Sequence, residues 1–408
     1  MTRWTLIAVG FLLAACPSLA NTWKNATSGT FSDTTKWTEG AYPNGQDAVA
    51  DLSLPDWQTG STYSTITNDV SIRLGRIVFG QTVNSWAALT LKPASGAVTI
   101  TLDSADGISE IVWANRQMGY GVTIETVLTG TNALHVNTVG QIVSEGLILK
   151  GQNTYSGGTV ILGGPFYLGC SSTATSGPVG TGSLVLNSGT QFGGNPDYTD
   201  VVLSNSVFMS GNIGLGSGHY CDLTMAGPMT LTGNCDLTPS APTYYKIILT
   251  GGIGEDAPGR SLAIAGKTMT DLGDYPAGAD QNVYVGGTNT FTGGLTIKAS
   301  RIEIASSANN SRMTGPVTVR TNAVLEVRST NGLSRASTVF LEQSAGVYGK
   351  LDLEANNSVM KLYLDGVRQP AGTYGSTASA AQTKSDNYFE DAGVLTVLPS
   401  RGTVITFR

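Results

Sequence analysis

Charged residues are scarce in this 408-residue chain, at 13% of the total, which is about half the usual share. There are 23 Lys and Arg against 29 Asp and Glu, which gives a net charge of −6, and the basic residues form no run. Nucleic acids and anionic membrane surfaces attract proteins through clustered Lys and Arg. The composition therefore excludes both as expected partners.

Histidine and cysteine are also few, with two and four residues. His135 lies in an alternating segment, His219 lies close to Cys221, and the chain has no Cys-x-x-Cys or His-x-x-x-His pair. Zinc sites typically need such spacings, and no Gly-x-Ser-x-Gly motif has a plausible histidine partner. We therefore expect no metal site, no cofactor and no catalytic residue.

Long apolar segments are absent except at the N-terminus. Arg3 precedes an apolar stretch at residues 6–15, and Ser18-Leu19-Ala20 follows as a small-residue cleavage signal. This order is typical of a secretory signal peptide, and the stretch is too short to span a bilayer. It predicts a signal peptide over residues 1–20 with cleavage after Ala20, and no later transmembrane segment. The alternative is a lipidated Cys16, because Leu13-Ala14-Ala15-Cys16 is similar to a bacterial lipobox.

Glycine, in contrast, is abundant, with 52 residues. Short runs such as residues 97–102 alternate Val, Ile and Leu with Thr, and pairs such as Gly157-Gly158 separate the runs. Alternation with a period of two is typical of half-buried strands, and glycine pairs are typical of turns. Beyond the signal peptide, no stretch of twelve residues shows helical periodicity. The sequence predicts an all-β protein.

One phrase occurs twice in the chain. Residues 153–161 read Asn-Thr-Tyr-Ser-Gly-Gly-Thr-Val-Ile, and residues 289–297 read Asn-Thr-Phe-Thr-Gly-Gly-Leu-Thr-Ile. Each copy is followed by Gly-Pro-Val, at Gly177 and at Gly315. A repeated unit of roughly 20–22 residues is the signature of a solenoid. We therefore predict about ten turns of a parallel β-solenoid in residues 119–345.

The regions on either side differ from this middle part. Residues 21–118 contain Trp23, Trp37, Trp57, Trp86 and Trp113, and we expect them to form an N-terminal β region that caps the solenoid. Residues 346–408 include the hairpin signal Asp365-Gly366. A solenoid needs an end that covers its last apolar turn. We expect residues 346–408 to be that C-terminal cap.

The repeated phrase resembles the autotransporter-associated β-strand repeat of bacterial secreted and surface passenger proteins. The residues that carry the resemblance are the asparagine, the aromatic residue and the two glycines of each copy, namely Asn153, Tyr155, Gly157, Gly158, Asn289, Phe291, Gly293 and Gly294. Leu295 stands where the motif has threonine.

The flanks agree with this resemblance. Residues 37–48 are similar to the opening of such proteins, and residues 364–375 are similar to their closing segment. The resemblance implies a right-handed parallel β-helix with a structural, adhesive or surface-associated role in a Gram-negative-type bacterium. No catalytic residue belongs to the motif.

We therefore expect a secreted, non-enzymatic, β-helical surface or extracellular protein, held on the surface or released, with an outer-membrane lipoprotein as the alternative location. A rival function is a glycan-binding adhesin, because Trp37 and Trp57 could stack on the sugars of an extracellular polysaccharide. The other interpretation of these tryptophans is that they fill the first turn of the core.

Acidic residues suggest a second rival, a polysaccharide-active enzyme, which would need two or three acids on one face. The candidate pairs are Asp197 with Asp200, Asp271 with Asp274, and Glu255 with Asp256, and the interpretation that we favour is solvated loop acids.

Two further patterns leave alternatives open. Arginines recur near glutamates in one segment. They could form an exposed ladder of opposite charges or a shallow groove for acidic glycans. The residues are Arg301, Arg312, Arg320, Arg328 and Arg335, near Glu303, Glu326 and Glu342. Cys221 and Cys235 stand in matching Cys-Asp-Leu-Thr phrases. They could form a disulfide in an oxidising compartment or remain buried thiols.

Overall fold

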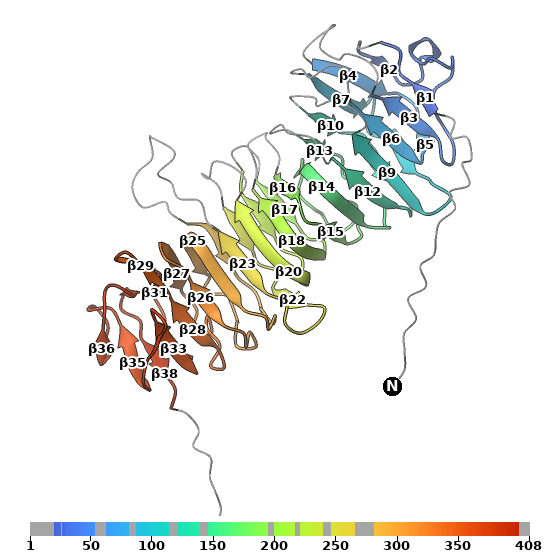
Figure 1. The fold of residues 1–408 in the computed structure, drawn as a ribbon. Helices are drawn as coiled ribbons and strands as arrows, with labels where there is room; N and C mark the ends of the chain where they lie inside the picture. The colour runs from blue at the N-terminus through green and yellow to red at the C-terminus, as the bar shows by residue number, and fades with distance from the viewer. Residues whose placement is uncertain are drawn as a thin grey trace, which may run out of the picture.

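The structure, a computed structural model, describes residues 20–25, 27–53, 63–80, 87–113, 121–138, 146–194, 200–216, 221–239, 246–265 and 281–399. Nearly all regular elements in these ranges are β-strands, apart from a 3-10 turn at Thr34–Lys36. The strands stack in parallel as a β-solenoid of about 11 turns, which Figure 1 shows as one elongated body. The predicted fold class is confirmed.

Two ladders of parallel strands run along the stack, and three long strands bend from one ladder into the other. The first ladder is built from β1 (Ala20–Thr22), β3 (Val49–Leu52), β6 (Arg76–Phe79), β9 (Ile108–Trp113), β12 (Ala133–Asn137), β14 (Thr159–Leu168), β15 (Leu184–Leu186), β18 (Val207–Leu215), β20 (Met229–Pro239) and β22 (Ile253–Glu255). The second ladder is built from β2 (Gly29–Thr30), β4 (Tyr63–Asn68), β7 (Ala88–Pro93), β10 (Val122–Ile124), β13 (Leu147–Leu149), β14, β16 (Thr190–Gly194), β18, β20, β23 (Leu262–Ala265), β25 (Leu295–Ile304), β26 (Val317–Val319), β28 (Thr338–Leu341) and β33 (Lys361–Leu364).

Other strands complete the turns. Near the N-terminus a separate sheet contains β5 (Ile72–Leu74), β8 (Thr99–Leu102) and β11 (Val127–Thr129). The second half of the chain has a longer one, here named the C-terminal ladder, made of β17 (Val201–Leu203), β19 (Leu223–Met225), β21 (Ile247–Leu249), β24 (Gln281–Val285), the end of β25, β27 (Ala323–Val327), β31 (Lys350–Leu353) and β37 (Phe389–Glu390).

The C-terminal end carries the antiparallel elements. Two hairpins project there, one made of β29 (Gln343–Ser344) and β30 (Val347–Tyr348), the other of β33 and β34 (Val367–Arg368). A four-stranded sheet lies beyond them, made of β32 (Asn357–Val359), β38 (Leu395–Val397), β35 (Gly372–Gly375) and β36 (Thr383–Lys384). No helix within the described residues is long and apolar enough to cross a membrane.

Some turns have the length that the repeat suggested, and others are longer. Leu295 pairs with Val317 and Val317 with Val339, at steps of 22 residues (317 − 295 and 339 − 317). Phe166 pairs with Phe192, a step of 26 residues (192 − 166). The repeat shows only the strands and their corners, whereas corner loops of variable length set the full length of each turn.

The tryptophan-containing region is the start of the solenoid and not a separate cap. Val122 of β10 pairs with Leu89 of β7, so the second ladder passes through the expected boundary at residue 118 without a break. Trp23 and Trp37 are buried within the first turn. The boundary came from composition, and a change in composition along a solenoid need not interrupt its strand pairing.

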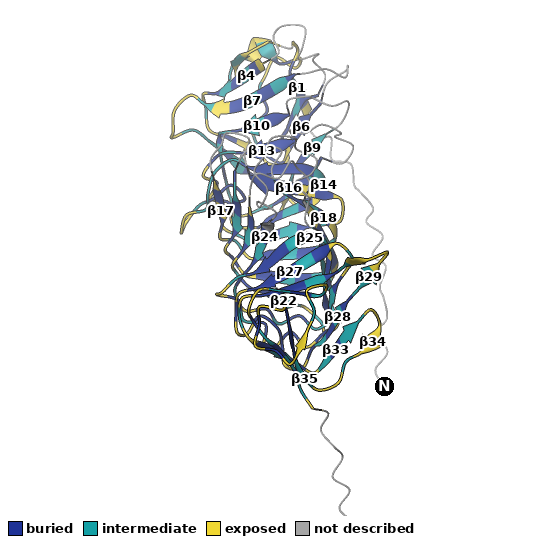
Figure 2. Cartoon of the chain, turned by 90° about the vertical axis from the view of Figure 1, so that its left-hand side faces the viewer, coloured by how far each residue is buried: buried dark blue, intermediate teal, exposed yellow. Residues whose placement is uncertain are grey.

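Alternation of side chains builds the core. Leu295, Val317 and Val339 are buried one above another, and Thr296 and Thr318, which also pair, are only half-buried. Residues that alternate along a strand point to opposite faces. Figure 2 shows the result, with buried strands along the stack and exposed residues at the corners and on the β29 and β34 hairpins.

The two glycines of the repeated phrase lie where neighbouring turns approach most closely. A Cβ on Gly157 would lie 2.3 Å from the Ala133 nitrogen in the turn before, and one on Gly293 would lie 2.2 Å from the Gly259 oxygen. Gly158 and Gly294 have φ angles of 87° and 108° and face the turn after, at Ser183 and Pro316. A left-handed φ favours glycine. The phrase therefore marks a corner that only glycine fits.

The asparagine of the phrase joins successive turns through its side chain. The Asn153 Oδ1 accepts from the Leu128 N–H at 2.7 Å, and its Nδ2 donates to the Pro178 carbonyl at 2.7 Å. Asn289 likewise accepts from the Ile253 N–H at 2.9 Å and donates to the Asn310 Oδ1 at 2.7 Å. The amide therefore supplies the donor and the acceptor that the corner backbone needs.

We expect Gly157→Ala to lower the free energy of unfolding by about 1–3 kcal/mol, because its new methyl group would overlap the backbone of the preceding turn. Gly96→Ala is the matched control, since no atom lies within 4 Å of the position that the new methyl group would take at this exposed glycine, and it should change stability by less than about 0.5 kcal/mol. Thermal and urea unfolding followed by circular dichroism measures both. Equal losses of unfolding free energy for the two substitutions would contradict the close approach of Gly157 to the backbone of the preceding turn.

Candidate functional site: the charge cluster

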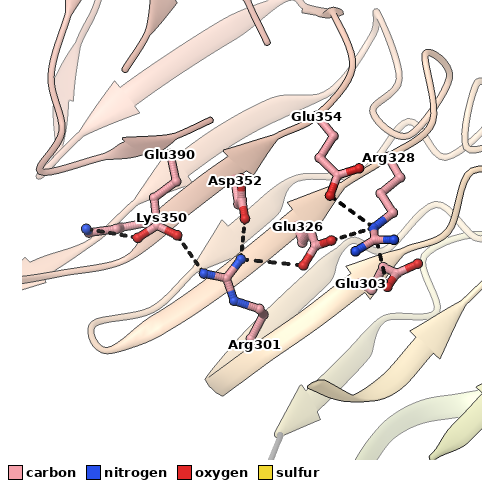
Figure 3. A network of polar contacts seen from close by, with 8 residues as sticks. All are labelled: Arg301, Glu303, Glu326, Arg328, Lys350, Asp352, Glu354 and Glu390. Carbon is pink, nitrogen blue, oxygen red and sulfur yellow. Dashed lines mark hydrogen bonds and ion pairs between the residues drawn. The ribbon is translucent and has the colours of Figure 1, made fainter. Parts of the chain in front are cut away.

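A cluster of charged side chains covers part of the C-terminal ladder. Its centre is a row of four acids in register on four successive strands: Glu303 pairs with Glu326, Glu326 with Asp352, and Asp352 with Glu390. Along β25, Ile302 and Ile304 flank Glu303 and are buried in the core, so the acid points away from the core. Figure 3 shows these side chains with the cations between them.

Arg301 holds the middle of the row. Its Nη1 contacts Asp352 and lies 3.4 Å from the Glu326 Oε2, and its Nη2 donates to the Glu390 Oε2 at 2.6 Å. Lys350 adds a contact from its Nζ to the Glu390 Oε1 at 3.1 Å. One guanidinium therefore bridges three strands, which suits its fixed fork of donors.

Arg328 neutralises the other end of the row. Its Nε lies 2.5 Å from the Glu326 Oε1, 3.5 Å from the Glu303 Oε2 and 3.3 Å from the Glu354 Oε1. Here too one cation joins carboxylates from three strands or strand ends. The charge cluster comprises Arg301, Glu303, Glu326, Arg328, Lys350, Asp352, Glu354 and Glu390.

Burial and neighbouring charges change the acidity of these carboxyl groups. Burial raises the pKa of Asp352 to about 6, although Arg301 opposes this change. Burial also raises the pKa values of Glu303 and Glu354 above their usual range. Burial acts in the same direction on Glu390, but hydrogen bonds from Lys350 and Arg301 outweigh it and hold the pKa of Glu390 below its usual value.

The predicted ladder of opposite charges is therefore present, but with other members. Arg301, Arg328, Glu303 and Glu326 belong to it. The remaining predicted residues, Arg312, Arg320, Arg335 and Glu342, form no ion pair with any residue that the structure describes. Lys350, Asp352, Glu354 and Glu390 are additional members. Lys350-Leu-Asp-Leu-Glu354 carried a signal, since every second residue is charged.

The charge cluster links neighbouring turns of the solenoid through ion pairs. Glu326 is 2% exposed and Asp352 is 6% exposed, and both are engaged by arginine. The carboxylates of the charge cluster are thus paired with cations. Cleavage of a polysaccharide needs an acid and a base that can reach the substrate. No group of three or more His, Cys, Asp or Glu residues suited to a metal ion occurs among the described residues.

The other acid pairs do not come together as a reactive site within the described ranges. Glu255 accepts from the Thr292 hydroxyl at 2.7 Å and from the Arg260 N–H at 2.9 Å, and Asp256 pairs with Arg260 at 2.9 Å. Burial would raise the pKa of Glu255, but these hydrogen bonds outweigh it and the pKa is lowered. Asp200 accepts from the Asp222 N–H. The other candidates, Asp197, Asp271, Asp274 and His219, lie outside the described residues.

Trp37 is not available to a glycan, which corrects the binding interpretation for this residue. Its ring is 0% exposed, its Nε1 donates to the Phe31 carbonyl at 2.8 Å, and it packs edge-on against Trp23 at 5.1 Å. The ring fills the first turn because a large aromatic surface gains most from burial there. Trp57 lies outside the described residues, as do Cys16 and the signal peptide up to residue 19.

Cys221 and Cys235 are not joined by a disulfide in the structure, so the alternative of two buried thiols is the one that the structure shows. Cys235 lies in β20 and pairs with Gly211 of β18, whereas Cys221 precedes β19 in the C-terminal ladder and lies against Gly194. The matching phrases thus fall on different ladders. Burial raises the pKa of Cys235 to about 12 and that of Cys170 to about 11.

We expect Arg301→Ala to destabilise the protein by about 3 kcal/mol, because three carboxylates on adjacent strands would lose their shared cation while remaining partly buried. Arg320→Ala is the matched control, since Arg320 is exposed and outside the cluster, and it should cost less than about 0.5 kcal/mol. Urea unfolding at neutral pH measures both variants. A cost for Arg301→Ala as small as that of the control would show that the cluster does not hold the strands together.

Comparison with known proteins yields one informative likeness. Over 274 aligned residues, 62% of this chain, the sequence is 26% identical to the adhesin BmaC autotransporter of Brucella suis biovar 1 (strain 1330). The aligned stretch spans 7% of the length of that protein. No family model and no solved structure matches the chain. The likeness and the solenoid together agree with a passenger-type protein of the autotransporter kind.

Proposed function

We propose that this protein is a non-enzymatic, passenger-type β-helical adhesin that works outside the cytoplasm of a Gram-negative-type bacterium. The observation that carries the proposal is the coincidence of an unbroken parallel solenoid with sequence similarity to an autotransporter adhesin over 274 residues. A solenoid contacts mainly its own neighbouring turns and so gives a long, regular outer surface. Such a surface suits adhesion to an extended partner such as an extracellular polysaccharide.

The condition of the acidic residues supports a non-enzymatic role. Glu326 and Asp352 are bound by Arg301, and Glu255 and Asp256 are held by residues of their own corner. Side chains that already serve as ties between strands are poorly placed to exchange protons with a substrate. The charged groups thus have a structural role in this proposal, and the outer surface of the solenoid does the binding.

Expression of the full chain in a Gram-negative host tests the proposal. We expect the protein on the cell surface or in the medium, by fractionation and protease accessibility, and we expect the cells to bind immobilised polysaccharides or host-cell surfaces more than cells with an empty vector. Cys16→Ser distinguishes the two routes of attachment, because it removes a lipid anchor but spares signal-peptide cleavage after Ala20. Retention in the cytoplasm, or release of reducing ends from polysaccharides by the purified protein, would contradict the proposal.

A further inference from the structure

The outward face of the second ladder changes character near its C-terminal end. Thr296 of β25 pairs with Thr318 of β26. Thr318 pairs in turn with Phe340 of β28, and Phe340 pairs with Tyr363 of β33. All four side chains are half-buried, whereas a neighbour along the strand such as Val339 is buried in the core. The four side chains therefore point to the outside of the solenoid, on strands that Figure 1 shows near its C-terminal end.

Two of these residues carry aromatic rings, which stack on each other. The ring centroids of Phe340 and Tyr363 lie 4.8 Å apart, and the ring planes differ by 18°. Arg368 of β34 pairs with Tyr363, so it lies on the same face, beyond the tyrosine. On the other side of the stack, the register neighbour of Phe340 is Thr318, whose side chain is much smaller than a ring. The stack therefore ends at Phe340, and the side of its ring that faces β26 lies beside a low surface.

The threonines next to this ring have hydroxyl groups that are available to a ligand. Within the described residues, neither the Thr296 hydroxyl nor the Thr318 hydroxyl takes part in a hydrogen bond. Ala263 of β23 pairs with Thr296 and continues the column toward the N-terminus. Ala263, Thr296 and Thr318 thus form a strip of small outward residues over three turns, with a step of about 4.8 Å. The strip ends at Phe340. Thr296, Thr318 and Phe340 are here named the Phe340 site.

Charges along this face nearly cancel. Six charged residues lie on or directly after the strands around the Phe340 site: Lys298, Arg320, Lys361, Arg368, Glu342 and Asp365. Lys298 is already paired with Asp236 at 2.6 Å, which leaves three cations against two acids. Attraction of an anionic polysaccharide or a nucleic acid depends on an excess of cations. The near balance of charge therefore favours an uncharged ligand.

An aromatic ring beside hydroxyl groups matches a sugar better than it matches a protein surface. A sugar ring has an apolar C–H face that can stack on an aromatic ring. Its hydroxyl groups both donate and accept hydrogen bonds, as threonine hydroxyls do. A stable protein partner would need about 800 Å² of surface on each side, with an apolar centre. One aromatic stack among threonines and charged residues is too small for such a centre.

We propose that the Phe340 site binds an uncharged polysaccharide, with one sugar unit lying against the Phe340 ring and above Thr318. The ring supplies the stacking surface, and the hydroxyls of Thr318 and Thr296 supply hydrogen bonds that orient the sugar. The inference rests on the proposed function, and it names the part of the outer surface that binds and the class of ligand.

Biolayer interferometry with immobilised polysaccharides and the purified full chain tests the site. The probes are dextran, mannan, galactomannan and xyloglucan, with alginate as the charged comparison. We expect binding to at least one of the four uncharged polysaccharides. Its affinity should change by less than about twofold between 0.05 and 0.5 M NaCl, because contacts to an uncharged ligand are not screened by salt.

Phe340→Leu is the deciding variant, because it keeps an apolar side chain on the strand and removes the ring face. It should weaken binding by about tenfold. Thr318→Val keeps the shape of the side chain and removes its hydroxyl, so it should weaken binding by about threefold. The matched control is Phe208→Leu, since Phe208 is also a half-buried outward phenylalanine but lies on β18 between Val185 and Thr230. This control should keep the affinity of the unmodified chain.

Circular dichroism checks that each variant folds, and Thr318→Val carries the test if Phe340→Leu does not fold. The proposal is overturned if none of the uncharged polysaccharides binds, if only alginate binds, or if salt abolishes the binding. It is also overturned if Phe340→Leu binds as tightly as the Phe208→Leu control. A chain that gives any of these results but still reaches the cell surface and mediates adhesion would retain the proposed function, with its contact surface elsewhere on the solenoid.

Discussion

Parallel pairing of strands from successive turns is the constraint on which the rest of this molecule depends. A turn satisfies its backbone N–H and C=O groups only by stacking on the next one, so no turn is stable alone. The corners must then let two backbones approach closely, and Gly157 and Gly293 have no room for a side chain. The same corners need extra hydrogen bonds, which Asn153 and Asn289 supply. The residues of the repeated phrase are thus the ones that the geometry of the corner requires.

The same stacking explains the charge cluster. Parallel strands in register bring equivalent positions next to each other, so an acid at one position meets acids above and below it, as Glu303, Glu326, Asp352 and Glu390 do. Arg301 and Arg328 resolve most of this repulsion because a guanidinium can contact several carboxylates at once. At Asp352, whose buried Oδ1 has no hydrogen-bond partner, burial raises the pKa to about 6.

The sequence predicted the class of fold because alternation and the Gly-Gly corners are local features. It predicted half of the charge cluster for the same reason, since Arg301 and Glu303 are two residues apart on one strand. It could not predict that Asp352 and Glu390 join them, because register between turns depends on loop lengths that no local pattern fixes. The sequence left alternatives open for the tryptophans and cysteines for a related reason: composition does not say whether Trp37 is buried, nor on which ladder Cys221 lies.

Distances along the axis test the stacking most directly. Thr90 and Thr318 are half-buried outward positions on β7 and β26, nine strand steps apart in the second ladder, whereas Thr90 and Thr123 are direct partners. Nitroxide labels and dipolar electron paramagnetic resonance should give about 40 Å for the first pair and strong short-range broadening for the second. A short distance for Thr90 and Thr318, or no broadening for Thr90 and Thr123, would contradict the solenoid.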